Sequence, residues 1–285
     1  MRTRQQILGL GLLMLTACSG PGTGLPGLVA NPPSERAEEL LAVLADTTPE
    51  GSMPLAVLED LVLRNPDLHD AIELAITACM AGKGFAYQPS PWASELLGDQ
   101  RFGITDELAA AENGYAIPVA DRVLAEGSMQ SRPALEREAF FGRGDRATID
   151  EWKGGNSSVD VGGCLEEGAD AVLGSFVAWA SVYDRVRWLA DESARSRDAD
   201  PRAIAVLAEW VECMENAGYQ TTSPVYDPPI DGGVEAAVTD ASCHASSGLT
   251  EVWTAVEVEV QWDLLADHAD ALAGLIAETT IPLTP

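Results

Sequence analysis

The sequence predicts a mainly α-helical protein, a disulfide-stapled helical body built from two related helix-loop-helix units with long irregular connections. Three observations carry this prediction. Apolar residues recur at helical spacing in several stretches, a short motif that ends such a stretch occurs twice, and each copy of the motif contains one cysteine and is followed by another. Strand signals are sparse, because alternating apolar and polar runs bounded by turn residues are rare in this chain.

The N-terminal residues predict an export signal, a lipidation site and a tether. Two arginines precede the apolar run 7–15, which is too short to span a membrane and continues into Leu-Thr-Ala-Cys. This pattern is typical of bacterial lipoproteins, so we expect residues 1–17 to be a signal peptide and Cys18 to carry a diacylglyceryl group. Residues 18–34 are rich in Gly and Pro and predict a flexible tether with a reach on the order of 20 Å. We therefore expect the protein to be anchored through lipid at the extracytoplasmic face of the cell membrane.

The remaining residues, 35–285, are expected to form one helical domain. Within it, unit one covers about 60–199 and unit two about 200–280. Two short amphipathic helices are predicted before unit one, at about 35–45 and 53–63, with a turn-forming Pro, Gly and Ser segment between them.

The first copy of the repeated motif, TACMAGKGF, ends a helix that we expect to begin at Pro66. Asn65 is a suitable N-cap, and proline fits the first helical position because its missing N–H would have no partner there. The predicted apolar stripe consists of Leu68, Ile72, Ala75, Ile76 and Cys79. Gly84 lies five residues after Cys79, where a left-handed residue ends a helix.

The second copy, ECMENAGY, has the same organisation. Asp200 and Pro201 begin the predicted helix, and Gly218 ends it five residues after Cys213. Its predicted buried stripe consists of Ile204, Leu207, Trp210, Val211 and Met214.

A second cysteine follows each copy and is expected to open another helix. Cys164 begins a stretch that predicts one helix to about Arg197, although Gly168 and Gly174 weaken its start. Cys243 leads through HASSG into a long helical pattern whose stripe is Leu249, Trp253, Val256, Val260, Leu264, His268, Leu272 and Leu275. Between Cys79 and Cys164 of unit one, at residues 103–152, short helices are predicted in DELAAAEN, PALEREAFF and ATIDEW.

Four cysteines remain after the lipidated one, and an even number in an exported chain predicts two disulfides. The duplicated unit favours pairing within units, Cys79 with Cys164 and Cys213 with Cys243. Pairing Cys79 with Cys213 stays open as the alternative. No metal site is predicted, because no two cysteines are spaced Cys-x-x-Cys and the three histidines are scattered.

Two stretches of unit two, DPRAIAVLAEWVECMENAGYQTTSP and EAAVTDASCHASSGLTEVWTAVEVEVQ, resemble a group of uncharacterised exported lipoproteins of actinobacteria. That group shares a Trp, Cys-Met, Gly-aromatic segment and a later cysteine before a C-terminal helix. The resemblance covers most of residues 60–275 and departs from the pattern at Ile76, where unit two has Trp210. The resemblance implies an exported, lipid-anchored protein with this helical architecture, and it implies no enzymatic activity.

The charge balance excludes nucleic acid as a partner. The formal net charge is −28, from 45 acidic and 17 basic residues, and loss of the two arginines of the signal peptide makes it more negative. Such a surface repels phosphate backbones. The expected partner is therefore a basic protein or a cell-wall ligand. Alternatively, the negative charge serves only to keep the protein soluble.

No catalytic, cofactor-binding or metal-binding residues are predicted, because the chain carries no nucleophile, metal or phosphate-loop motif. We therefore expect a non-catalytic binding or interaction module. The alternative is an exported hydrolase with a carboxylate-based site, for which Glu166 with Glu167 and Asp198 with Asp200 are the nearest pairs.

The expected ligand contacts are aromatic residues in loops that contain proline, where binding residues are often found. These candidates are Tyr87, Trp92, Tyr219 and Tyr226. Packing over helix ends is the alternative role for them. His244 is expected in a loop, and His268 is expected to hydrogen-bond within the core.

Overall fold

The computed structural model describes residues 33–90, 101–115, 129–149 and 157–281, and these are mainly helical. Cys18 and Trp92 lie outside the described residues. From Pro33 onward the chain forms one compact unit. Its α-helices are α1 (Glu35–Thr47), α2 (Pro54–Val62), α3 (Pro66–Gly82), α4 (Glu107–Asn113), α6 (Ala134–Phe141), α7 (Cys164–Leu173), α8 (Phe176–Asp198), α9 (Pro201–Asn216), α10 (Gly233–Ser247) and α11 (Leu249–Ala277).

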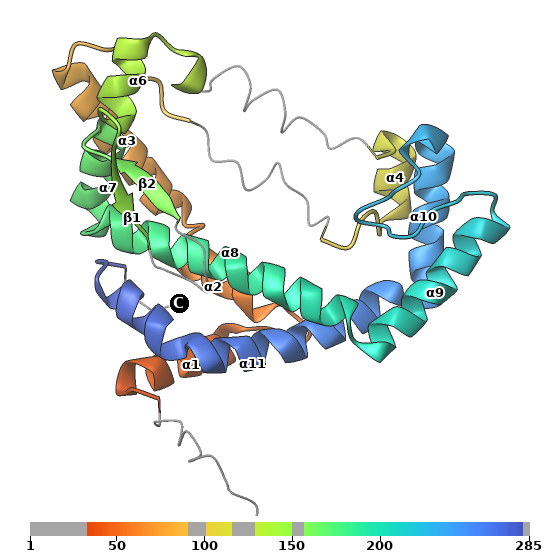
Figure 1. Ribbon diagram of the computed structural model, residues 1–285. Helices are drawn as coiled ribbons and strands as arrows, with labels where there is room; N and C mark the ends of the chain where they lie inside the picture. Colours follow the sequence, from red (N-terminus) through yellow and green to blue (C-terminus); the bar gives the residue numbers. More distant parts are fainter. Residues whose placement is uncertain (1–32, 91–100, 116–128, 150–156, 282–285) are drawn as a thin grey trace, which may run out of the picture. The chain divides into compact units, whose positions relative to one another are not determined.

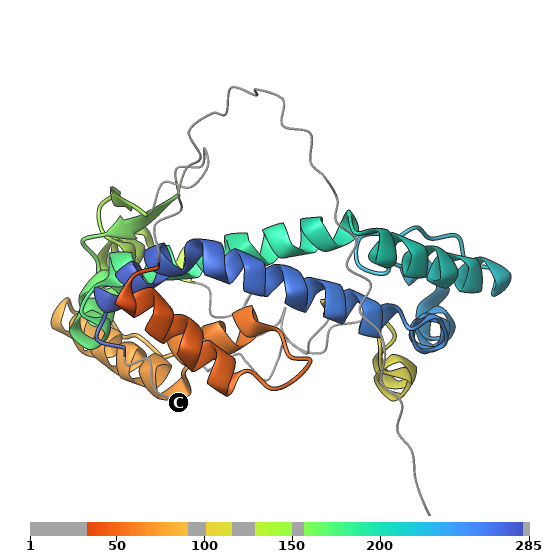
Figure 2. The same cartoon turned by 90° about the horizontal axis from the view of Figure 1, so that it is seen from below.

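The two longest helices, α8 and α11, form the most extensive helix pair of the described residues and lie side by side in both views (Figures 1 and 2). They run antiparallel: Ser193 of α8 bonds Glu257 of α11, whereas Trp188, earlier in α8, contacts His268, later in α11. Each unit thus contributes one long helix to the pair.

The main apolar core forms where α1 and α2 pack against this pair. Leu40 and Leu44 of α1 and Leu58 of α2 are fully buried there, among leucines, valines and alanines of α7, α8 and α11. The amphipathic pattern of α1 and α2 dictates this arrangement, because each helix can bury its apolar face only against another element.

A disulfide joins two helices in each unit. Cys79–Cys164 links α3 to α7, and Cys213–Cys243 links α9 to α10. These are the within-unit pairs that the duplicated sequence favours. Each disulfide lies in its own small apolar cluster, so each unit has a covalently closed helix pair in addition to its long helix.

Both copies of the Cys-Met motif end their helices in the same way. The N–H of Phe85 donates to the carbonyl of Met80, and the N–H of Tyr219 donates to that of Met214, both at 2.9 Å. Gly84 and Gly218 have φ of 86° and 95°, the left-handed conformation that this ending requires. The prediction of a glycine stop five residues after each cysteine is confirmed.

The prediction of a single helix from Cys164 to about Arg197 is wrong. The chain breaks at Gly174, where φ is 80°, and Ser175 then caps α8 by accepting from the N–H of Ala178. Thr280 from the C-terminal segment bonds the carbonyls of Val172 and Leu173, so the end of α7 is closed by a residue far away in sequence. Gly174 can adopt this positive φ without strain, and the Ser175 hydroxyl offers the backbone a cap in place of a continued helix, so both residues favour the break.

Four other expectations of secondary structure and burial are corrected. Cys243 lies near the end of α10 and does not open a helix, and His244 is buried in α10 rather than in the loop that the sequence predicts. In ATIDEW, residues 147–148 belong to strand β1 (Asp145–Thr148), which pairs antiparallel with β2 (Ser158–Val161). Ile204 is 53% exposed, because α9 buries Ala203 and Val206 instead.

Candidate functional site

The four aromatic residues that we predicted as ligand contacts do not form a common surface. Tyr87 is half-buried in the Cys79–Cys164 cluster, and its hydroxyl donates to Glu73 at 2.9 Å. Tyr219 packs in the Cys213–Cys243 cluster. Tyr226 is 73% exposed, and Trp92 lies outside the described residues.

The carboxylates considered for a hydrolase each have a local partner. Glu166 accepts from the N–H of Gly162, and Glu167 faces Lys83 at 3.9 Å. Asp198 binds Arg197 at 2.7 Å, and Asp200 caps α9 and binds Arg202 at 3.0 Å. These four side chains therefore stabilise helix ends and ion pairs.

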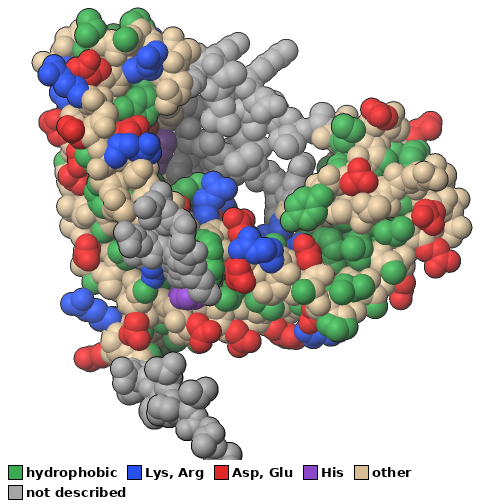
Figure 3. Space-filling model, in the orientation of Figure 1, with side chains coloured by type: hydrophobic (Ala, Val, Ile, Leu, Met, Phe, Trp, Pro, Cys, Tyr) green, Lys and Arg blue, Asp and Glu red, His purple; other side chains and the backbone are tan. Residues whose placement is uncertain are grey.

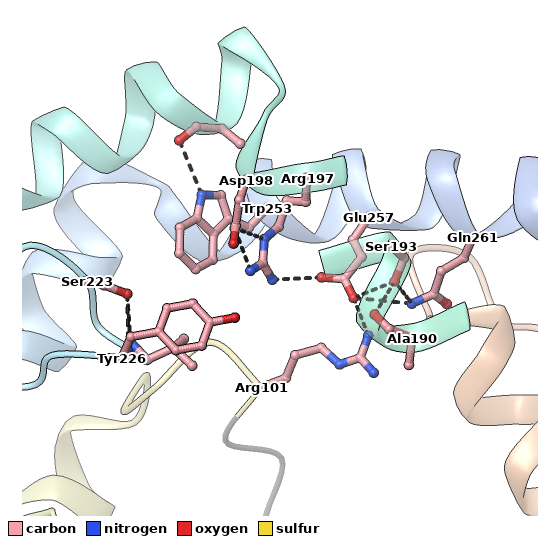
Figure 4. A network of polar contacts seen from close by, with 12 residues as sticks. Arg101, Ala190, Ser193, Arg197, Asp198, Ser223, Tyr226, Trp253, Glu257 and Gln261 are labelled. Atoms are coloured by element: carbon pink, nitrogen blue, oxygen red, sulfur yellow. Dashed lines mark hydrogen bonds and ion pairs between the residues drawn. The ribbon is translucent and has the colours of Figure 1, made fainter. Parts of the chain in front are cut away.

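A buried polar network crosses the α8–α11 pair and is centred on Glu257 (Figure 4). Its carboxylate is fully buried and accepts from Arg197 at 2.8 Å, from Ser193 at 3.1 Å, from Gln261 at 3.3 Å and from Arg101. The amide oxygen of Gln261 accepts in turn from the N–H of Leu55 at 3.1 Å. The network therefore joins α8 and α11 to the first turn of α2 and to the segment before α4.

Arg197 is buried although it carries a full charge. Its guanidinium lies 4.2 Å from the centre of the Trp253 ring and 5.4 Å from that of Phe102, and it also binds Asp198. Two carboxylates and two aromatic faces thus replace the water that this group loses on folding. Because Phe102 touches both Trp253 and Arg197, the network also fixes residues 101–105.

A second buried polar pair lies on successive turns of α10. Nε2 of His244 is 3.5 Å from Oδ1 of Asp240, and both side chains are buried. Asp240 accepts from Trp210 of α9 and from Tyr115, which follows α4, both at 3.0 Å. Burial raises the pKa of Asp240 to about 6 and lowers the pKa of His244 to about 4. At neutral pH the histidine is therefore neutral and the carboxylate ionised.

A depression of about 570 Å³ lies between the first turns of α2 and α11. Three segments line it: the turn before α2 with α2 itself (Pro49, Gly51, Ser52, Met53, Ala56, Val57, Asp60), the segment before α4 (Phe102, Thr105) and the start of α11 (Thr250, Thr254). Its volume is in the range of pockets that hold small molecules. The buried Glu257 network connects two of these walls directly, through Gln261 to Leu55 of α2 and through Arg101 to Phe102.

The depression is also connected to the Asp240–His244 pair. Thr250, which lines it, has its hydroxyl 3.2 Å from Nδ1 of His244. Gly103 packs closely on the loop before α10, since a Cβ added there would lie 2.8 Å from the carbonyl oxygen of Pro224. The walls of the depression are thus held by contacts with α8, α10 and the α9–α10 loop.

The walls combine apolar groups, hydroxyls and one charge. Met53, Val57 and the edge of Phe102 provide apolar surface, and a serine and three threonines provide hydroxyls. Asp60 is the charged residue among the lining residues that the structure describes. Such a mixture is typical of small-molecule sites, where a few polar groups orient a ligand against an apolar wall.

A second hollow lies on α6 and around Gly142, lined by Arg137, Glu138, Arg143 and Asp160 among others. Arg143 and Glu138 form an ion pair at 2.5 Å, and Arg137 donates to backbone carbonyls. Asp160 faces Arg146 at 3.6 Å, so the charged groups of this hollow are already engaged by other residues or by the backbone.

Within the described residues, no three His, Cys, Asp or Glu side chains are grouped so that they could hold a metal ion. None of the helices in that part of the chain is both long and apolar enough to cross a membrane.

No protein-family model, curated protein or solved structure matches the chain.

The lining of the depression and the buried network were not predicted from the sequence. Glu257 and Gln261 lie four residues apart on α11, with Ser193 and Arg197 at the same spacing on α8. Polar residues repeated at i, i+4 on two helices that are otherwise apolar on one side are the signal that could have revealed the network.

Proposed function

We propose that this chain is a non-catalytic binding protein of the cell envelope, anchored through lipid on Cys18, and that the depression at Phe102 is its ligand site. The observation that supports this most is the depression itself, with apolar, hydroxyl and carboxylate walls drawn from three segments. Walls fixed by a buried ion network keep the site preformed, which lowers the entropic cost of binding.

The two disulfides support an extracytoplasmic location, because such bonds persist mainly in oxidising compartments. The pattern Leu-Thr-Ala-Cys at residues 15–18 and the Gly/Pro tether support lipid anchoring. The tether reaches on the order of 20 Å, so an anchored body acts in a thin layer above the membrane.

The anchor is tested with the substitution Cys18→Ala. We expect wild-type protein to incorporate a labelled fatty acid and to sediment with membranes, and the variant to do neither, because the sulfur that carries the lipid is gone. Unlabelled wild type, together with a variant that still sediments with membranes, would refute the anchor.

Binding is separated from hydrolysis by incubating the purified mature chain with peptidoglycan, polysaccharide and peptide libraries. We expect retention of a ligand without turnover, and loss of retention when Ala56→Phe fills the depression. Reproducible turnover that a single Asp or Glu substitution abolishes would replace the binding function with the exported hydrolase.

A further inference from the structure

We propose that the depression at Phe102 binds a small organic cation, an ammonium group carried on an apolar stem. This inference rests on the proposed function, because it takes the depression as the ligand site. It adds the chemical class of the ligand and the residue that selects it, Asp60.

Asp60 is an exposed side chain of α2 at this site, and it has no hydrogen bond or ion pair with another residue of the described chain. Two cations close to these lining residues are already paired: Arg64, four residues after Asp60, binds Glu59 at 2.5 Å, and Arg101, next to Phe102, binds the buried Glu257. The carboxylate of Asp60 is therefore available to an incoming cation. An ammonium group is its natural complement.

The helix ends that face the depression do not offer an anion site. Pro54, the first residue of α2, has no N–H, and the N–H of Leu55 donates to Gln261. The N–H groups of Ala56 and Val57 both donate to the carbonyl of Met53. The donors that would bind a phosphate or carboxylate at this helix start are thus already used.

The start of α11 is compensated by an acidic side chain. Glu251 lies in the first turn of α11, and its Oε2 is 3.8 Å from the position of a Cβ added at Gly248. A carboxylate at this place offsets the positive end of the helix dipole. The formal net charge of −28 of the whole chain also favours a cation over an anion.

The remaining lining fits a stem with little polarity of its own. Met53, Val57 and Phe102 offer apolar contact, and the hydroxyls of Ser52, Thr105 and Thr254 can accept hydrogen bonds from an ammonium group.

The acidic face of the molecule is seen in Figure 3, where red side chains outnumber blue ones over α9, α10 and α11. Diffusing cations are drawn toward such a surface.

Three probes of equal chain length test the class directly: hexylamine, 1-hexanol and hexanoate. Their dissociation constants for the mature chain are measured by NMR titration at low salt. We expect hexylamine to bind most tightly, 1-hexanol more weakly and hexanoate most weakly, because the stem is shared and the head group alone changes. Hexanoate binding as tightly as hexylamine would overturn the cation proposal.

The role of Asp60 is tested with Asp60→Asn and with the matched control Asp267→Asn, which removes an exposed carboxylate of α11 outside the depression. We expect Asp60→Asn to weaken hexylamine binding about threefold to fivefold, the effect of one exposed ion pair, and to leave 1-hexanol unchanged. Asp267→Asn should leave both affinities as they are. Equal losses of hexylamine affinity in the two variants would contradict selection by Asp60.

The site itself is tested separately with two variants that fill it from different segments, Ala56→Phe and Thr105→Trp. Each must retain both disulfides and its helical circular dichroism to be compared. Loss of all three probes in both variants would support the depression even if the charge selection failed. Unchanged binding of the probes in both variants would refute the depression as the ligand site, and with it the proposed function.

Discussion

Asp240 and His244 give the fold two opposite responses to pH. The pKa of Asp240 is raised, so its contribution to stability is full below pH 4 and is lost as pH rises through about 6. The pKa of His244 is lowered, so its contribution is full above pH 6.5 and is lost as pH falls through about 4. The two slopes oppose each other between pH 4 and 6. In the wild type we therefore expect only a weak net dependence from this pair.

Single variants should separate the two responses. Asp240→Asn leaves the histidine alone, so the free energy of unfolding should fall as pH is lowered from 6.5 to 4. His244→Gln leaves the carboxylate alone, so the free energy of unfolding should fall as pH is raised from 4 to 6. Over these pH ranges, the free energy of unfolding of each variant should change by about 2 kcal/mol more than that of the wild type. Urea unfolding at several pH values measures this, and slopes of the same sign in both variants would contradict the assignment.

Burial decides how much an ion pair matters, and α11 offers a matched comparison. Glu257 is fully buried against Arg197, whereas Glu259 binds the exposed Arg202 at 2.7 Å. Glu257→Gln should lower the free energy of unfolding by about 3 to 5 kcal/mol, because it leaves buried positive charge uncompensated. Glu259→Gln should change it little, because water screens the exposed pair. Chemical denaturation of both variants provides the measurement. Similar losses of unfolding free energy in the two variants would contradict a larger role in stability for the buried ion pair.

At the scale of elements, α3 and α7 approach closely because Gly168 has no side chain. A Cβ added there would lie 2.7 Å from Cγ1 and 2.9 Å from the backbone N of Ile76. In unit two the corresponding position of the motif is Trp210, which fills its own helix interface. The departure at Ile76 is thus explained: in unit one a smaller residue and a glycine bring the helices together instead.

This contact predicts opposite outcomes for two glycine substitutions. Gly168→Ala should destabilise the fold by about 1 to 3 kcal/mol, because overpacking displaces α7 from α3. Gly274→Ala, at a helical position of α11 with open space around the new Cβ, should be neutral or stabilising by up to about 1 kcal/mol. Thermal unfolding of the two variants is the measurement, and a neutral Gly168→Ala would contradict the close approach.

The sequence predicts the helices best where local chemistry decides their ends. Proline after Asn65 and after Asp200 begins α3 and α9, and glycine after each Cys-Met segment ends them. Prediction from the sequence fails where residues far apart in the chain decide the secondary structure. Thr280 binds the last carbonyls of α7 beside the local break at Gly174, and hydrogen bonds across a two-stranded ladder hold residues 145–148 in a strand rather than a helix.

The candidate site was beyond sequence reasoning for the same reason. The predicted apolar stripe of α11 includes Val260 and Leu264, which are only partly buried, although Leu264 does pack against the main core. The fully buried residues of this stretch are Glu257, Gln261 and Leu265. Polar side chains can take these positions only because α8 supplies partners for them. The depression likewise needs three segments that are far apart in sequence, and no local pattern brings them together.

At the scale of the whole molecule, the described body combines two disulfide-linked helix pairs with one antiparallel pair of long helices. The Cys79–Cys164 bond closes a separation of 85 residues and the Cys213–Cys243 bond one of 30. In the chain-entropy model loops of these lengths stabilise by roughly 4.6 and 3.7 kcal/mol. A rigid body of this kind suits recognition by a preformed site more than a site that closes on its ligand.

The most direct test of the central claim is amide hydrogen exchange of the mature chain, measured alone and with saturating hexylamine or 1-hexanol. We expect slower exchange in three segments, residues 52–60, 101–105 and 249–254, because a ligand in the depression contacts all three. The Ala56→Phe variant should show no such change. Slower exchange confined to other segments, or an equal response in the variant, would contradict the depression at Phe102 as the binding site.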